Sequence, residues 1–315
     1  MELFSAITDY GMDFLRALES IRTPFLDEFF LLVTKLGEET LPIVVLCLIL
    51  WCVDKRLAYG IGVSFFFSGL CVHGLKITCR VPRPWVIDPE LSVVGNAKEA
   101  AGGFSFPSGH TQNAGSIFLT LGMWMKKKPW AFPVCLLLAL LVGFSRMYLG
   151  VHTPADVVVG FIITLITSAI AVTVFNKNSE KAMNITLTAL GVFSVAAAVY
   201  SLILLGSGVI EHHYASDTCK MGAAGAAFCI GLFIERKYIN YTEKTDKLWQ
   251  QAVKVAIGLG GTLLIKSGLK ALLGDNIPAD ITRYFLMIIW AINVWPLLFS
   301  KWFKPSEAQK ESAEA

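Results

Sequence analysis

Long apolar runs separated by short polar segments dominate this chain. A helix needs roughly 20 apolar residues to cross the hydrocarbon core, and somewhat shorter runs suffice when a helix is tilted or buried among neighbours. The pattern therefore predicts an all-α, polytopic membrane helical bundle of about nine transmembrane helices. The nine runs lie near residues 40–53, 57–75, 111–125, 130–149, 155–175, 183–205, 221–234, 251–273 and 281–299.

The first of these runs is short, and we expect its helix to begin near Gly37. Before it, residues 3–35 mix Phe, Leu and Met with spaced Asp, Glu and Arg, which predicts an amphipathic helix at the membrane interface. The expected organisation is an N-terminal interfacial segment (1–36), a membrane core (37–205), additional C-terminal transmembrane helices (206–300) and a polar cytoplasmic tail (301–315).

The composition supports an integral membrane protein. The chain is 55% hydrophobic and 16% charged, with a mean hydropathy of +0.60, whereas soluble domains carry roughly 25% charged residues. The formal net charge is only +3, and the basic residues gather in loops rather than along one helix face. We therefore expect no nucleic-acid partner.

Positive charge marks one side of the membrane. Short cytoplasmic loops hold the excess of Lys and Arg, and here every second connection is enriched in them. We therefore expect the other connections, which include residues 76–110 and 146–154, to face the outside of the plasma membrane, or the lumen of an internal one. The cationic connections contain Lys55-Arg56, Lys126-Lys127-Lys128, Lys177 with Lys181, the group Arg236, Lys237, Lys244 and Lys247, and Lys301, Lys304 and Lys310.

The seven cysteines indicate no metal centre, because no pair has zinc-ligand or CxxC spacing. We expect neither a metal nor a cofactor. Most of the cysteines are interpreted as small apolar helix residues. Only Cys79 and Cys219 fall in predicted loops on one side, so a disulfide between them is a hypothesis.

Two cations follow the second apolar run. Lys76 lies at its outer end, and Arg83 stands between Pro82 and Pro84, which hold the backbone extended. An arginine donates two parallel hydrogen bonds to phosphate, and a lysine adds a compact charge. The simpler alternative is a pair of cations that snorkel to lipid headgroups.

The segment Pro107-Ser108-Gly109-His110 opens the next run. Ser108 is a candidate N-cap whose helix terminus favours an anion, and Gly109 lets the backbone approach a ligand closely. His110 could protonate a leaving oxygen as a general acid. The alternative is an ordinary cap followed by a headgroup histidine.

A third segment combines Ser145-Arg146 with His152 and Asp156. Arg146 is another phosphate donor, and His152 precedes Thr153-Pro154, a strong helix start. Asp156 could orient the imidazole of His152, or it could be the acidic member of a capping arrangement with Thr153. Capping explains neither Arg146 nor His152.

All three segments lie at the outer ends of predicted helices. Together they resemble the type 2 phosphatidic acid phosphatase superfamily, which is related to the vanadium haloperoxidases and has the signature K-x6-RP, PSGH and SR-x5-H-x3-D. The resemblance covers roughly residues 37–175 and implies a six-helix-type phosphatase core. The matching residues are Lys76-x6-Arg83-Pro84, Pro107-Ser108-Gly109-His110 and Ser145-Arg146-x5-His152-x3-Asp156.

The resemblance implies metal-independent hydrolysis through a phosphohistidine. His152 would attack phosphorus, Asp156 would assist it, and His110 would protonate the leaving group. Three cations can replace a metal in neutralising the transferring group. The phosphate would be bound by Lys76, Arg83, Ser108, Gly109 and Arg146.

Lys266 and Lys270 lie four residues apart on one face of the eighth predicted helix. Ionisable groups in a membrane are costly and usually serve a site, so these lysines are candidate contacts for a headgroup or a second phosphate. Snorkelling to the interface is the alternative.

We expect an enzyme that hydrolyses a lipid monophosphate or diphosphate, with membrane lipids around it and water as the phosphoryl acceptor. The outward site and compact chain favour undecaprenyl diphosphate as the substrate. The family resemblance also implies phosphatidic acid, phosphatidylglycerol phosphate and sphingoid-base phosphates as alternatives. A lipid acceptor in place of water would make the protein a phosphotransferase, and a transporter or flippase that binds phosphate without cleaving it is the alternative from another class.

Overall fold

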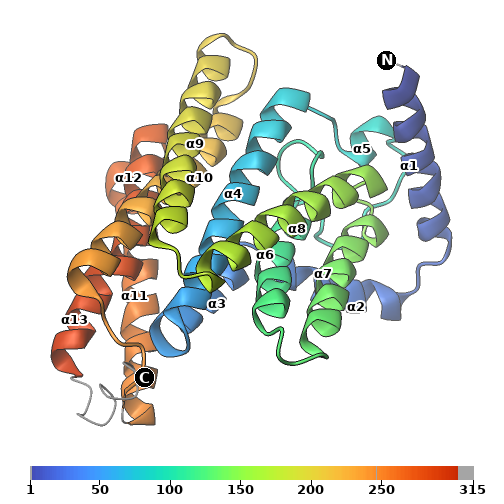
Figure 1. The fold of residues 1–315 in the computed structure, drawn as a ribbon. Helices are drawn as coiled ribbons and strands as arrows, with labels where there is room; N and C mark the ends of the chain where they lie inside the picture. The colour runs from blue at the N-terminus through green and yellow to red at the C-terminus, as the bar shows by residue number, and fades with distance from the viewer. Residues whose placement is uncertain (1, 246, 304–315) are drawn as a thin grey trace. The chain divides into compact units, whose positions relative to one another are not determined.

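The computed structural model describes residues 2–245 and 247–303, and every regular element in these ranges is helical (Figure 1). The chain divides into two compact units. The first contains residues up to 42 and 67–172, and the second contains residues 43–66 and those from 173 onward. The helices α3, α4 and α8 contribute residues to both units.

The helices follow one another with short connections, except for a long loop between α5 and α6. In chain order the α-helices are α1 (Glu2–Ser20), α2 (Pro24–Thr34), α3 (Thr40–Cys52), α4 (Lys55–Cys79), α5 (Pro84–Ile87), α6 (Gly109–Trp124), α7 (Ala131–Tyr148), α8 (Pro154–Asn176), α9 (Glu180–Gly206), α10 (His212–Ile234), α11 (Leu248–Leu273), α12 (Ile277–Ile289) and α13 (Trp295–Trp302).

Seven helical segments among the described residues are long and apolar enough to cross a membrane. They are α4 with α5, α7, α8, α9, α10 with the turn that follows it, α11, and α12 through α13. They coincide with seven of the nine predicted runs, and the shorter α3 (13 residues) and α6 (16 residues) coincide with the other two. The prediction of an all-α polytopic membrane protein is confirmed.

The N-terminal segment differs from its prediction in two ways. Residues 3–35 form two helices rather than one, because Thr23 caps a new helix by accepting a hydrogen bond from the backbone N–H of Leu26 and Pro24 occupies its first turn. The helix predicted to begin near Gly37 begins at Thr40 instead, because Lys35–Gly37 forms a separate 3-10 turn.

The predicted loop position of Cys219 is wrong. Helix α10 begins at His212, so Cys219 lies within that helix, where it is buried beside the hydroxyl group of Ser201. Cys79 is exposed at the end of α4, and all seven cysteines are free thiols. Residues 304–315 of the predicted tail lie outside the described residues.

Polar side chains join the apolar helices of the first unit. On α6, the amide of Gln112 donates to the hydroxyl oxygen of Ser68 on α4 at 2.9 Å, and the hydroxyl groups of Thr120 and Ser168 lie 3.0 Å apart between α6 and α8. Gly160 permits α8 to approach the start of α6, because a Cβ atom there would lie 2.9 Å from the carbonyl oxygen of Ser108. Hydrogen bonds and small residues are the usual means of helix association in a membrane.

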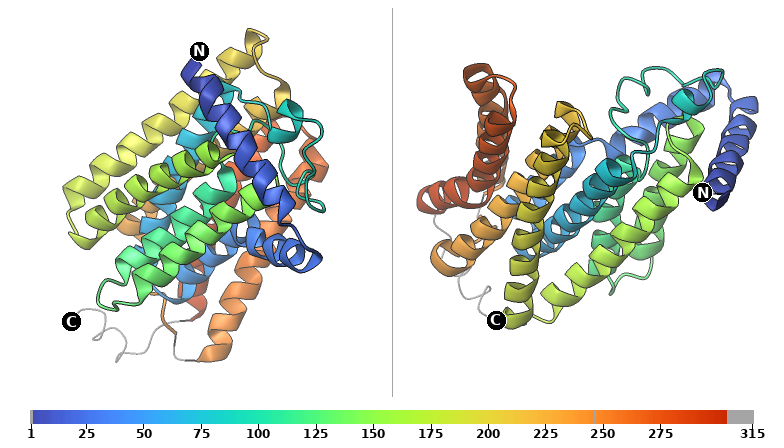
Figure 2. Two further views of the ribbon diagram at one scale, coloured as in Figure 1. Left: turned by 90° about the vertical axis from the view of Figure 1, so that its right-hand side faces the viewer. Right: turned by 90° about the horizontal axis from the view of Figure 1, so that it is seen from above.

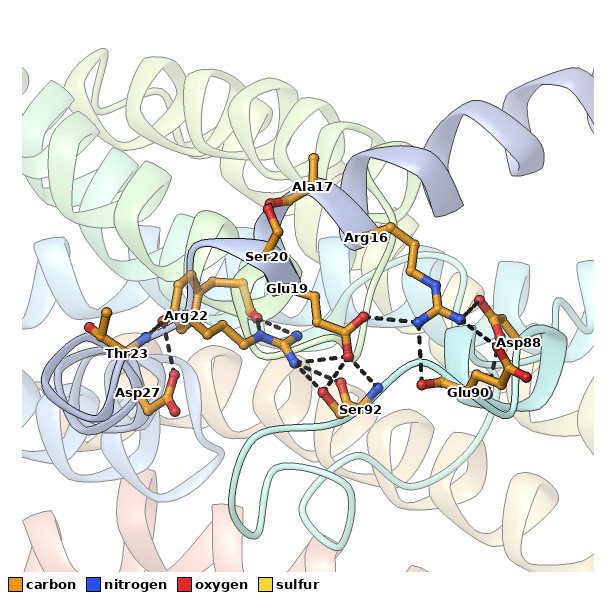
Figure 3. Close-up of polar contacts among 11 residues, drawn as sticks. Arg16, Ala17, Glu19, Ser20, Arg22, Thr23, Asp27, Asp88, Glu90 and Ser92 are labelled. Atoms are coloured by element: carbon orange, nitrogen blue, oxygen red, sulfur yellow. Dashed lines mark hydrogen bonds and ion pairs between the residues drawn. The ribbon is translucent and has the colours of Figure 1, made fainter.

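A polar clamp, formed by Arg16, Glu19, Arg22 and Ser92, fastens α1 to the long loop and to the end of α7 (Figure 3). Arg22 donates two hydrogen bonds to the carbonyl oxygen of Tyr148, at 3.1 and 2.8 Å, and one to that of Ser92 at 2.9 Å. Glu19 accepts from the backbone N–H of Ser92 at 2.9 Å. Because α1 also packs against α7 (Figure 2), the clamp fixes the loop beside the residues that follow Tyr148.

The second unit is built on the packing of α10 against α9 and α12, with α11 against α12. The indole N–H of Trp51 donates to the carbonyl oxygen of Ala291 at 2.9 Å, and the ammonium group of buried Lys254 donates to that of Trp51 at 2.7 Å. These bonds satisfy polar groups that the apolar surroundings would otherwise penalise.

Candidate active site

His152 is the centre of a buried constellation in the first unit. It lies in the short connection between α7 and α8, with 2% of its surface exposed. Its Nδ1 atom lies 3.2 Å from Oδ2 of Asp156, and its Nε2 atom lies 2.9 Å from Nη1 of Arg83. Because a guanidinium group only donates, Nε2 is the acceptor, and the neutral ring carries its proton on Nδ1, toward Asp156.

Asp156 is held by three donors on one carboxylate oxygen. In addition to the imidazole, Oδ2 accepts from the hydroxyl group of Ser105 at 2.6 Å and from the backbone N–H of Thr153 at 2.8 Å. The N–H of Asp156 in turn points to Oγ1 of Thr153 at 3.5 Å. Asp156 therefore makes the contacts that both sequence hypotheses require, one set with Thr153 at the start of α8 and one with the ring of His152.

Backbone carbonyl groups hold two of the predicted cations. Arg83 has the extended backbone that its flanking prolines predict, and its guanidinium group donates to the carbonyl oxygens of Gly102 at 2.6 Å, Gly103 at 2.8 Å and Val151 at 3.1 Å. The ammonium group of Lys76 donates to the carbonyl oxygen of Phe104. The long loop thus curls around both side chains and presents them toward His152.

Arg146 is the most constrained cation of the site. Its side chain is completely buried, and Nη1 donates to Oγ1 of Thr34 at 2.7 Å. Its Nε and Nη2 atoms are buried and have no hydrogen-bond partner among the described residues. Leaving donors of a buried charge unpaired costs several kcal/mol, so this guanidinium group is poised to bind an anion.

The start of α6 completes the constellation. Ser108 is its N-cap, as predicted, and accepts from the backbone N–H and the hydroxyl group of Thr111. Nothing lies within 4 Å of the place where a side chain on Gly109 would begin, so the helix terminus is open to a ligand. His110 follows, and its Nε2 atom is buried without a partner among the described residues.

Charge interactions show that these groups converge. His110 and His152 lie within electrostatic range of each other and of the same three cations, Lys76, Arg83 and Arg146. Burial is the main cause that holds the pKa of His152 well below its usual value, and the three positive charges lower it further. The imidazole of His152 is therefore neutral at neutral pH.

No cluster of three or more His, Cys, Asp or Glu side chains that could hold a metal occurs among the described residues.

The structure brings together in the first unit all eight residues predicted for catalysis and phosphate binding. Lys266 and Lys270 belong to the second unit, where they line a cavity of their own. Sequence reasoning missed Ser105 and Thr34, the partners of Asp156 and Arg146. Ser105 stands two residues before the Pro107 motif and could have been noticed, whereas nothing in the sequence links Thr34 to a residue 112 positions away.

Comparisons with known proteins find a family for this chain. Residues 57–180 match the family described as PAP2 superfamily, and residues 219–307 match its transmembrane extension, described as PAP2 superfamily phosphatase, transmembrane extension. The second match includes the helices of the second unit that follow residue 219.

Three curated relatives differ in what their names say they act on. A phosphatidylglycerophosphatase B of Bacillus subtilis is 28% identical over 172 residues, which is 48% of this chain and 76% of that protein. A probable sphingosine-1-phosphate phosphatase of Dictyostelium discoideum is 32% identical, over 50% of this chain and 40% of its own length. An undecaprenyl-diphosphatase of Bacillus subtilis is 32% identical, over 31% of this chain and 48% of its own length.

The titration of His152 should follow from its burial beside Arg83. We expect its midpoint to lie below 6.5, the ordinary value, and Arg83→Gln to raise it because one positive charge is removed while burial persists. Nitrogen-detected NMR of histidine-labelled protein checks this, since the chain has only five histidines. Arg80→Gln, a change at an exposed arginine three residues before Arg83, is the control. A midpoint at or above 6.5 in the unaltered protein would contradict the assignment.

Proposed function

Because the chain belongs to the type 2 phosphatidic acid phosphatase (PAP2) superfamily, we propose that the site around His152 removes the phosphate group of a membrane lipid. The family match and the phosphatase names of its relatives support a lipid phosphate hydrolase. The observation that carries the proposal is the buried guanidinium group of Arg146. Two of its nitrogen donors have no partner in the described part of the chain, and they lie within charge range of a neutral histidine.

In the first step, Nε2 of His152 attacks the phosphorus atom. Its lone pair is available because the ring proton lies on Nδ1. Asp156 accepts a hydrogen bond from that N–H group and stabilises the positive charge that develops on the ring. In the structure Arg83 donates to Nε2 of His152. When substrate binds, the same guanidinium group donates to a phosphate oxygen instead. A P–N bond forms as the bond from phosphorus to the lipid oxygen breaks.

Positive groups neutralise the three equatorial oxygens during this transfer. Lys76, Arg83 and Arg146 supply fixed charges, and Arg146 needs no reorganisation because its free donors are already buried in place. The hydroxyl hydrogen of Ser108 and the open backbone at Gly109 add neutral donors at the start of α6. Phosphoryl transfer depends mainly on such positioning and charge neutralisation.

His110 gives its proton to the departing lipid oxygen. The dianionic substrate favours the protonated imidazole, and Nε2 is the atom free to donate. The neutral His110 then takes a proton from water, whose oxygen attacks the phosphohistidine. The P–N bond breaks, inorganic phosphate leaves, and both histidines return to their starting forms.

Within this reaction class the specific substrate that we propose is undecaprenyl diphosphate. One relative is named as an undecaprenyl-diphosphatase, whereas others are named for phosphatidylglycerol phosphate and sphingosine 1-phosphate. The shared part of these molecules is the terminal phosphate, and the proposed roles of the site residues involve only that part. A preference for the lipid must therefore come from surfaces beyond the site.

The active site is proposed to face the outside of the membrane. In the first unit, α6 begins at the site and ends before Lys126, whereas α7 begins after Lys128 and ends beside Arg146. The lysine cluster and the site therefore lie at opposite ends of the same two helices, and a lysine-rich connection is typical of the cytoplasmic side.

Removal of the nucleophile should abolish turnover. We expect His152→Ala to lower phosphate release by at least about a thousandfold, and wild-type protein to form an acid-labile phosphohistidine in a single turnover. Purified protein with a metal chelator would be assayed on undecaprenyl diphosphate, phosphatidic acid, phosphatidylglycerol phosphate and sphingosine 1-phosphate, with undecaprenyl diphosphate giving the highest kcat/KM.

Arg80→Gln should retain this activity, since Arg80 is exposed and takes no part in the site. Phosphate release that persists in His152→Ala protein would contradict the covalent mechanism. Movement of lipid without phosphate release would instead indicate a flippase.

His110→Gln should affect substrates according to their leaving groups. A lipid alkoxide needs a proton as it departs, whereas p-nitrophenolate does not, so the variant should lose roughly a hundredfold or more on phosphatidic acid and much less on p-nitrophenyl phosphate. Steady-state kcat/KM on the two substrates measures this difference. Equal losses on both would remove His110 from the role of general acid.

Thiol labelling tests the orientation. Cys79 is exposed at the end of α4 that carries the site. A membrane-impermeant maleimide added to intact cells should label it and not a Cys79→Ser protein. A cysteine introduced by Lys127→Cys into the Cys79→Ser protein should react only after the cells are opened. The reverse pattern would place the site on the cytoplasmic side.

A further inference from the structure

A cationic cavity lies in the second unit and contains no residue of the active site. Its volume is about 450 Å³, within the usual range of small-ligand pockets. Four of its lining side chains are positively charged and come from three helices. They are Lys220 of α10, Lys266 and Lys270 of α11, and Arg283 of α12, with Ser267, Ala271 and Tyr284 between them.

Arg283 is the buried part of this cavity. It is only 5% exposed, and its guanidinium group donates to Asp280, which also accepts from the hydroxyl group of Ser216. Asp280 is therefore occupied by more than one donor, and Lys220 lies 3.6 Å from it as well. The Nε atom of Arg283 is buried and has no partner among the described residues. A buried donor without a partner costs folding free energy and indicates an acceptor that the protein itself does not supply.

The lysines around Arg283 are less firmly held. Lys270 pairs with Asp275 at 3.3 Å, and Lys220 pairs with Asp217 at 3.1 Å, but both aspartates are more than half exposed. Exposed pairs of this kind contribute little to stability, so a ligand can replace them. Lys266 forms no ion pair among the described residues, although it is half-buried on the wall of the cavity. The cavity therefore has more positive groups than firmly bound negative ones.

We propose that this cavity is a second anion-binding site, which takes a phosphate group. A planar guanidinium group and several ammonium groups around one volume are the donors that a phosphate prefers. The four cations lie near the start of α10, the end of α11 and the start of α12, where a lipid headgroup or free phosphate can enter from the interface. The site extends the sequence hypothesis for Lys266 and Lys270 by two cations, and it stands whether or not the first unit hydrolyses phosphate.

Phosphate binding to a protein that cannot turn over separates the two sites. Equilibrium dialysis of His152→Ala protein in lipid-free detergent with radiolabelled inorganic phosphate should show binding at two classes of site. The added changes Lys266→Gln and Lys270→Gln should weaken one class by roughly tenfold or more, because two charge-assisted hydrogen-bond donors are lost. These side chains are not completely buried, so the fold should survive the change.

Matched variants keep the result specific. Lys244→Gln, at an exposed lysine of the same unit outside the cavity, should leave both classes unchanged. Replacement of Lys266 and Lys270 by arginine should retain the second class. A second arm adds phosphatidic acid or phosphatidylcholine to the micelles. Displacement of labelled phosphate from the second class by phosphatidic acid alone identifies a lipid headgroup as the ligand, and no displacement identifies free phosphate.

The proposal is overturned if phosphate binds to a single class of site, if Lys266→Gln and Lys270→Gln do not change its affinity, and if phosphatidic acid does not bind at the cavity either. Phosphate release by the wild-type protein is measured separately. The second class can persist in a protein that releases no phosphate, and phosphate release can persist when the second class is absent. The two proposals therefore fail in distinguishable ways.

Discussion

Burial of positive charge beside a neutral imidazole is the constraint on which the first unit depends. Removing a guanidinium or ammonium group from water costs several kcal/mol unless its donors are bonded. The protein meets this demand for Arg83 and Lys76 with carbonyl groups of the loop at residues 102–104. For Arg146 the residues that the structure describes supply only Thr34, and two nitrogen donors are left without a partner. The difference explains how one cation can hold the loop while another is reserved for a ligand.

The same constraint explains what the N-terminal helices α1 and α2 contribute to the first unit. The cations face the long loop between α5 and α6, residues 88–108, and such a loop holds a defined shape only if its chain is bonded elsewhere. The polar clamp supplies these bonds through Ser92, and Arg22 ties the same network to the end of α7. Phe30 of α2 packs against Tyr148 and Val151 in one apolar cluster, directly before His152. Helices α1 and α2 contribute none of the predicted site residues, yet their contacts fix the chain beside His152.

Sequence alone could predict the helical bundle and select the candidate phosphate-binding residues, because both rest on local patterns. Apolar runs determine the spans, and the prolines around Arg83 or the capping residue Thr153 fix nearby backbone in a way that can be read from neighbours. It could not predict Thr34 or the carbonyl groups at Gly102 and Gly103, because these contacts join distant segments and involve atoms that every residue has. Cys219 was misplaced for a related reason, since the polar start of α10 looks like loop until its packing is known.

Arg83 shows how one side chain can serve both stability and reactivity. Its hydrogen bond to Nε2 of His152 occupies the lone pair that attacks phosphorus in the proposed mechanism. A phosphate oxygen is a stronger acceptor for a guanidinium group than a neutral nitrogen is, because the bond is charge-assisted on both sides. In the proposed mechanism, the arriving anion takes the guanidinium group and leaves Nε2 of His152 free to attack. The contact between Nδ1 and Asp156 keeps the ring proton on that nitrogen, so Nε2 is the atom that carries the lone pair.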